Sequence, residues 1–254
     1  MRLNVTEAGE GPPLILLHGL FGAAANLGAV ARALAPAHRV ISLDLRNHGA
    51  SPHAAEMSYA AMAGDVAETM TALDLSRAAV AGHSMGGKVA MLLALTQPER
   101  VERLAVLDIA PVAYGPAFRG YAAAMQALPL APGLTRAEAA AALAGAVPDA
   151  GMRAFLLQNL RLDGPAPAWR IGLDPIAAAL PAIESWPETQ GGHPYSGPTL
   201  FLAGARSDYV QDAHRPLIRA LFPTARFVRV RDAGHWVHAD APAAVAATLA
   251  AFLR

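Results

Sequence analysis

A serine flanked by glycines stands where a short apolar run gives way to a helical pattern. The segment Gly82–Gly87 reads Gly-His-Ser-Met-Gly-Gly and directly follows the apolar run Ala78–Ala81. In a sharp strand-to-helix turn, flanking glycines remove the Cβ atoms that would clash and leave the serine hydroxyl accessible. The amides at the start of the following helix point to the position where an oxyanion would develop. The pattern predicts that Ser84 is the nucleophile of an acyl-transfer reaction.

A histidine near the end of the chain has the right position to act as the base. His235 lies just after the apolar run Arg226–Val230, in the segment Gly234–His238. If both runs are strands of one parallel sheet, the imidazole and the Ser84 hydroxyl lie at the same sheet edge. A neutral imidazole there can take the hydroxyl proton. We therefore predict that His235 is the general base.

Two aspartates suit the chain order serine, acid, histidine. Asp108 ends the run Leu104–Leu107, and Asp208 lies on the loop after the run Thr199–Leu202. Many hydrolases with this order place the acid as Gly-x-x-Asp after the later strand. Here Ser207 occupies that position, and Asp208 comes one residue late. Because a shift of one residue points a side chain elsewhere, we favour Asp108 as the acid and keep Asp208 as the alternative.

The loop after the first apolar run is expected to complete an oxyanion hole. This loop, His18–Gly22, reads His-Gly-Leu-Phe-Gly. The backbone N–H of Leu20 or of Phe21, together with that of Met85, would hold the developing negative charge. Loss of one such donor costs on the order of 3 kcal/mol of transition-state stabilisation.

The glycine-rich segment also fits a second pattern, that of a phosphate-binding loop. Gly82 to Lys88 matches Gly-x-x-x-x-Gly-Lys, but the next residue is Val89, where such loops need Ser or Thr to hold magnesium. Nucleotide binding would also leave His235 without a role. Nucleotide binding is therefore the less favoured interpretation, and we expect Lys88 on the helix surface or with its stem packed.

The elements that must position these residues alternate along the chain. Continuous apolar runs are typical of strands that are buried on both faces of a parallel sheet. Between several of them, apolar residues recur at helical spacing, as in Met62–Leu73 and Val89–Thr96. This alternation predicts an α/β fold with a mostly parallel central sheet flanked by helices. The predicted strands are Leu14–Leu17, Arg39–Leu43, Ala78–Ala81, Leu104–Leu107, Thr199–Leu202 and Arg226–Val230.

The pattern changes between residues 111 and 198, which are rich in alanine and proline. We predict that this segment is a helical cap inserted into a core formed by residues 1–110 and 199–254. The candidates to line an acyl pocket are Phe21, Met125, Leu156, Trp169 and Trp186. Each of them could equally belong to the core, which is the interpretation that we favour for any single one.

Composition limits the classes of partner. The 20 basic and 20 acidic side chains give a net charge of +0, so nothing favours a nucleic-acid phosphate backbone. Without cysteine, disulfides and thiolate chemistry are excluded, and we predict neither a metal nor a cofactor. The apolar runs are too short to span a membrane, and the N-terminus does not resemble a secretory signal, which predicts a cytoplasmic protein. The oligomeric state cannot be read from the sequence.

Several motifs agree in order along the chain: His18–Gly22, Asp44–Ser51, Gly82–Lys88, Asp108–Pro111 and Gly234–Ala239. Together they resemble the α/β-hydrolase superfamily and, within it, the small bacterial esterases of the YbfF type. The resemblance implies a small-molecule substrate, a carboxylic ester of a short to medium acyl chain or a thioester such as acyl-CoA, and it implies Asp108 as the acid. The alternatives are a carbon–carbon bond hydrolase or perhydrolase-like enzyme with the same triad, and a non-catalytic binding protein with the same fold.

Overall fold

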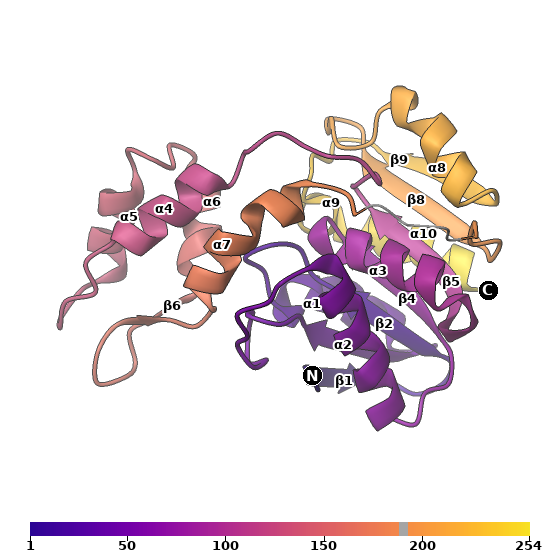
Figure 1. Ribbon diagram of the computed structural model, residues 1–254, viewed down its shortest axis with the longest axis horizontal. Helices are drawn as coiled ribbons and strands as arrows, with labels where there is room; N and C mark the ends of the chain where they lie inside the picture. Colours follow the sequence, from indigo (N-terminus) through magenta and orange to yellow (C-terminus); the bar gives the residue numbers. More distant parts are fainter. Residues whose placement is uncertain (188–192) are drawn as a thin grey trace.

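The chain folds around a seven-stranded sheet in the order β1-β3-β2-β4-β5-β8-β9, as the computed structural model shows for residues 1–187 and 193–254 (Figure 1). The predicted mostly parallel sheet is confirmed, because each pairing is parallel except that of β1 with β3. The sequence does not predict β1, since this edge strand is half-exposed and lacks a continuous apolar run. The strands are β1 Asn4–Ala8, β2 Pro13–Leu17, β3 Arg39–Asp44, β4 Ala78–His83, β5 Val101–Leu107, β8 Thr199–Gly204 and β9 Ala225–Val230.

Helices cover both faces of this sheet, which explains the continuous apolar runs of its strands. In β2, Ile15 and Leu17 pack in the cluster that includes residues of α2, α3 and α8, whereas Leu14 and Leu16 pack in the cluster of α1, α9 and α10. The flanking helices are α1 Gly28–Leu34, α2 Tyr59–Ala72, α3 Met85–Thr96, α8 Arg215–Leu221, α9 Val237–Asp240 and α10 Pro242–Leu253. Short 3₁₀ helices are η1 Ala24–Leu27, η2 Pro98–Arg100 and η3 Asp212–His214.

The chain between β5 and β8 forms a group of helices that extends beside the sheet (Figure 1). These helices have a small apolar cluster of their own, which includes Leu128, Leu143 and Leu157. That residues 111–198 form a separate cap domain stays a prediction, and residues 188–192 of that range lie outside the described residues. The elements are α4 Arg119–Ala127, α5 Arg136–Leu143, α6 Ala150–Leu157, β6 Leu160–Arg161, β7 Ala168–Trp169 and α7 Leu173–Glu184. None of the described helices is long and apolar enough to cross a membrane.

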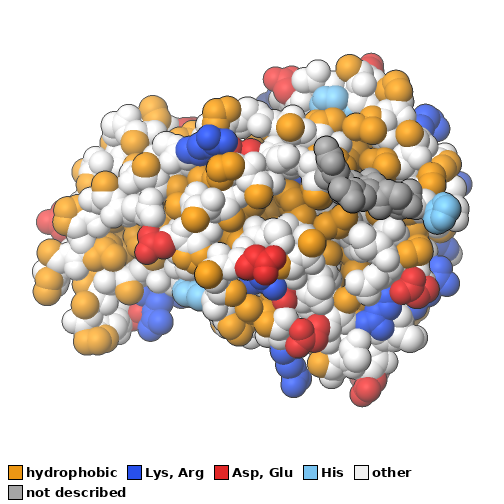
Figure 2. Space-filling model, viewed as in Figure 1, with side chains coloured by type: hydrophobic (Ala, Val, Ile, Leu, Met, Phe, Trp, Pro, Cys, Tyr) orange, Lys and Arg blue, Asp and Glu red, His pale blue; other side chains and the backbone are white. Residues whose placement is uncertain are grey.

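Charged side chains of both signs are interspersed over the face of the molecule seen in Figure 2. This mixture agrees with the net charge of +0.

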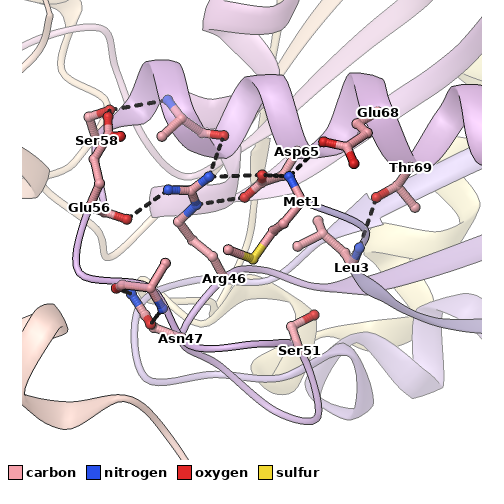
Figure 3. A network of polar contacts seen from close by, with 12 residues as sticks. Met1, Leu3, Arg46, Asn47, Ser51, Glu56, Ser58, Asp65, Glu68 and Thr69 are labelled. Atoms are coloured by element: carbon pink, nitrogen blue, oxygen red, sulfur yellow. Dashed lines mark hydrogen bonds and ion pairs between the residues drawn. The ribbon is translucent and has the colours of Figure 1, made fainter.

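A buried ion pair fixes the loop that follows β3 (Figure 3). Arg46 donates from Nε and Nη2 to the two carboxylate oxygens of Asp65 on α2, at 2.6 and 2.8 Å. The terminal ammonium group of Met1 lies 2.5 Å from the same carboxylate. Because both Arg46 and Asp65 are buried, this two-point pairing offsets the cost of removing their charges from water. The loop is thereby tied to α2, and it carries His48 toward the candidate site.

Candidate active site

Ser84 occupies a strained turn between β4 and α3. Its backbone has φ 53° and ψ −120°, a conformation that residues other than glycine rarely adopt. A Cβ atom on Gly82 would lie 2.1 Å from the carbonyl oxygen of Gly86, and one on Gly86 would lie 2.5 Å from that of Leu17. The turn therefore requires glycine on both sides, because the strands and the helix approach too closely for a side chain.

A chain of hydrogen bonds joins the three residues favoured as nucleophile, base and acid. The Nε2 atom of His235 lies 3.0 Å from Ser84 Oγ, and its Nδ1 atom lies 2.8 Å from Asp108 Oδ2. Ser84 follows β4, Asp108 follows β5 and His235 follows β9, so all three lie at the carboxyl edge of the sheet. This arrangement allows a proton to pass from the hydroxyl to the imidazole while the carboxylate stabilises the resulting charge.

The Asp108 carboxylate is fully buried and held at both oxygens. The Gly204 amide donates to Oδ1 at 2.8 Å, and the Ser207 hydroxyl donates to Oδ2. Asp208 is exposed, one residue beyond the serine that contacts the acid. The residue spacing thus places Ser207 against Asp108 and leaves Asp208 at the surface.

Two neighbours restrict His235, and the sequence did not reveal either of them. The ring of Tyr209 stacks on the imidazole, with 3.8 Å between ring centres and 19° between planes. The carbonyl of His235 accepts a hydrogen bond from Nε2 of His83 at 2.8 Å. Burial lowers the pKa of His83 well below its ordinary value, so His83 is a neutral donor. No sequence pattern identifies such contacts, because they join residues from separate loops.

One of the two predicted amides of the His18–Gly22 loop is already occupied. The Phe21 N–H donates to Nε2 of His48 at 3.1 Å, while Nδ1 of His48 donates to the Arg46 carbonyl at 2.9 Å. Burial lowers the pKa of His48 to about 3, so this residue is neutral and can accept the Phe21 proton. Within the described part of the chain, the amides of Leu20 and Met85 have no such acceptor. They are the donors that remain for an oxyanion.

A large cavity of about 390 Å³ opens beside Ser84 and His235. Met152 and Phe155, three residues apart on α6, contribute to one wall, where Phe155 packs against Trp236 with 5.2 Å between ring centres. Over residues 1–187 and 193–254, no group of three or more His, Asp or Glu side chains is placed to hold a metal ion. The apolar side chains that line this large cavity are Leu20, Leu27, Phe118, Met152, Phe155 and Trp236.

The five pocket residues suggested by the sequence do not line the large cavity. Phe21, Met125 and Leu156 are buried in the packed core, and Trp186 packs against the same core. Trp169 lines a different surface pocket. The sequence predicts helices in this part of the chain, but it does not tell which face of a helix meets the cavity.

A small cavity of about 40 Å³ also adjoins Ser84 and is lined by Lys88. Only 1% of Lys88 is exposed, so the expectation of a surface position was wrong and its ammonium group is buried with the stem.

Beside this small cavity, groups of the core hold the C-terminal end of α7. Three successive carbonyls accept hydrogen bonds: Ile183 from the Tyr59 hydroxyl at 2.7 Å, Glu184 from the Tyr114 amide at 2.8 Å, and Ser185 from Lys88 Nζ at 2.5 Å.

The sheet order, the turn at Ser84 and the hydrogen-bonded residues around it define the class of this protein. The chain belongs to the α/β hydrolase fold family, whose sequence profile matches residues 12–242.

Three relatives make the similarity more specific. The chain is 44% identical over 239 residues to the sn-1-specific diacylglycerol lipase ABHD11 of Mus musculus, and the matched region covers 91% of this chain and 77% of the mouse protein. It is 38% identical over 259 residues to esterase YbfF of Escherichia coli, and the matched region covers 100% of this chain and 99% of the esterase. Among solved structures, a marine microorganism esterase matches with a TM-score of 0.95 and 37% identity over 99% of both chains.

Proposed function

We propose that this chain is a serine hydrolase that cleaves carboxylic esters through an acyl-enzyme on Ser84. The observation that carries the proposal is the chain of hydrogen bonds from Ser84 through His235 to Asp108. The names of the relatives, an esterase and a diacylglycerol lipase, agree with this chemistry.

The reaction would proceed in two acyl-transfer steps. Ser84 Oγ attacks the ester carbonyl and passes its proton to Nε2 of His235, and the amides of Leu20 and Met85 hold the oxyanion. The tetrahedral intermediate then breaks its bond to the alcohol oxygen, which leaves with the proton from His235. A water molecule next loses a proton to His235, attacks the acyl carbon and releases the carboxylic acid, which restores the Ser84 hydroxyl.

The lining of the large cavity suits a largely apolar group on one side of the ester bond. Its apolar side chains would bury the larger of the two groups joined by the ester bond. The expected substrates are small-molecule esters of short to medium acyl chains. Thioesters such as acyl-CoA would follow the same two steps, with a thiol as the leaving group.

Replacement of the nucleophile tests this proposal. We expect Ser84→Ala to reduce kcat for p-nitrophenyl acetate and butyrate by about 10⁵-fold or more, because the acyl acceptor is lost. Ser76→Ala is the matched control, since Ser76 is exposed and precedes β4 at the opposite end from Ser84. A fluorophosphonate probe should label the wild type and not Ser84→Ala. Undiminished turnover by Ser84→Ala would eliminate the mechanism, and a wild type that resists the probe would favour a non-catalytic binding protein.

A further inference from the structure

The two cavities that meet at Ser84 can be assigned to the two sides of an ester, if the proposed function holds. His235 lines the large cavity and does not line the small one. Because His235 must give its proton to the leaving oxygen, the leaving group occupies the large cavity. The acyl chain then enters the small cavity. Its volume of about 40 Å³ has room for about three to four heavy atoms beyond the carbonyl carbon.

Lys88 gives this small cavity an unusual polar end. It is the only lysine of the sequence, and its ammonium group lies 4.9 Å from the ring centre of Tyr114 and 5.6 Å from that of Tyr59. Burial lowers the pKa of Lys88 to about 7. Among the described residues, no carboxylate lies within ion-pair distance of it, and the Ser185 carbonyl accepts only one of its three N–H bonds. Two donors are left for a ligand.

A carboxylate oxygen supplies the complementary acceptor. Glu184, which also lines the small cavity, bonds Arg119 through Oε2 at 2.8 Å. Its Oε1 is buried and has no hydrogen-bond partner in the described part of the chain. The two tyrosine hydroxyls do not compete for this oxygen, because that of Tyr59 donates to Ile183 and that of Tyr114 donates to Tyr209.

We propose that Lys88 and Glu184 form a polar subsite that selects a hydroxyl group on the acyl chain of the substrate. A hydroxyl can accept from the Lys88 ammonium and donate to Glu184 Oε1 at the same time, and thus satisfies both buried groups. A methyl group would satisfy neither, and a carboxylate would meet the negative charge of Glu184. Ester substrates with a 3-hydroxyacyl group are therefore the preferred class.

The position of Lys88 along α3 supports this chain length. Its amide donates to the Ser84 carbonyl at 3.1 Å, so the two residues are one helical turn apart, and both line the small cavity. We place the hydroxyl group on the third carbon, counted from the carbonyl, because a volume of about 40 Å³ leaves room for only a short chain between Ser84 and Lys88.

The kinetic test compares ethyl 3-hydroxybutyrate with ethyl butyrate, which share a leaving group and a carbon chain. We expect the wild type to hydrolyse the hydroxy ester with a kcat/KM at least about tenfold higher, which corresponds to about 1.4 kcal/mol. Lys88→Met, which keeps the length of the stem, and Glu184→Gln should each bring that ratio close to one. An unchanged ratio in both variants would overturn the proposal. So would a wild-type preference for ethyl butyrate or for monoethyl succinate, since the latter would indicate an anion site.

Binding can be measured without turnover and without replacement of Lys88. Because the sequence has a single lysine, protein labelled with ¹³C-lysine gives one lysine spin system by NMR. In Ser84→Ala protein, ethyl 3-hydroxybutyrate should shift the Cε signal of Lys88 and raise its pKa, whereas ethyl butyrate should do neither. Equal shifts with both esters would contradict the subsite. Loss of probe labelling at Ser84 in the wild type would instead contradict the proposed function, so the two failures are distinguishable.

Discussion

Replacement of the carboxylate at residue 108 gives the sharpest test of how the site is arranged. Asp108→Asn keeps the size and shape of the side chain but exchanges an acceptor for a group that can donate. In the wild type, Oδ2 of Asp108 accepts from Nδ1 of His235 at 2.8 Å and from the Ser207 hydroxyl, while Oδ1 accepts from the Gly204 amide. The amide can keep its oxygen toward Gly204, and its NH₂ group then faces His235.

That change would reverse the proton positions on the imidazole. With an NH₂ group opposite Nδ1, the stable tautomer of His235 carries its proton on Nε2 and points it at Ser84 Oγ, only 3.0 Å away. The imidazole can then no longer accept the hydroxyl proton. In a serine protease the same exchange lowers kcat by about 10⁴-fold, equivalent to about 5.5 kcal/mol, and we expect a loss of this order here.

Asp208→Asn is the matched control for this measurement, because it makes the same exchange on an exposed side chain. Initial rates of p-nitrophenyl butyrate hydrolysis should fall about 10⁴-fold for Asp108→Asn and less than about twofold for Asp208→Asn. Thermal melting of both variants checks that each one is folded. If the larger loss followed Asp208→Asn, or if the two losses were equal, the assignment of the acid would be refuted.

Three further predictions concern the surroundings of the site. Ser207→Ala removes a hydrogen bond to the charged Asp108 and should lower kcat/KM about tenfold; an unchanged rate would show that the bond does not contribute to catalysis. Burial lowers the pKa of His48 to about 3 in the folded protein, whereas an exposed histidine has a pKa of about 6.5. As the pH falls below about 6.5, the unfolded chain therefore binds a proton at His48 before the folded chain does. From pH 6 to 4, this residue alone should decrease the free energy of unfolding by about 1.4 kcal/mol per pH unit. Urea titrations of the wild type and of His48→Asn across this range measure the free energy of unfolding, and the same dependence on pH in both proteins would contradict the prediction. Gly49→Ala should destabilise the fold by about 3 kcal/mol or more, because the backbone there has φ +56° and the new Cβ would lie 2.1 Å from the carboxyl carbon of Asp44. Gly64→Ala is the control, because Gly64 lies on α2 with open space around it, and this substitution should stabilise the fold by up to about 1 kcal/mol. Thermal melting measures both effects.

Much of the fold could be predicted because buried parallel strands leave a strong signal. The runs at β2, β3, β4, β5, β8 and β9 are apolar on both faces, so each stands out without knowledge of its neighbours. The strand β1 gives no such signal, because it is antiparallel and half-exposed at the sheet edge. The helices between β5 and β8 could be expected as a group, but their many alanines blur the boundaries of each one.

The candidate site divides in the same way. Ser84, Asp108 and His235 could be proposed from the sequence because each follows a predicted strand, and parallel strands end at one sheet edge. The side chains that form the cavity wall could not be identified from the sequence, because Phe155 faces the cavity while its neighbour Leu156 faces the core. The orientation of a docked helix decides that difference. The bond between the Phe21 amide and His48 was equally invisible, because it depends on how two loops fold over each other.

The fixed end of α7 has a consequence for how this enzyme could acquire new substrates. The wall beside Lys88 is fastened to the core by three hydrogen bonds, whereas Met152 and Phe155 reach the other side of Ser84 from α6. Substitutions on α6 can therefore enlarge or reshape one compartment while the opposite one keeps its form. Under the proposed assignment of the two cavities, the choice of alcohol can change in evolution or by engineering independently of the choice of acid.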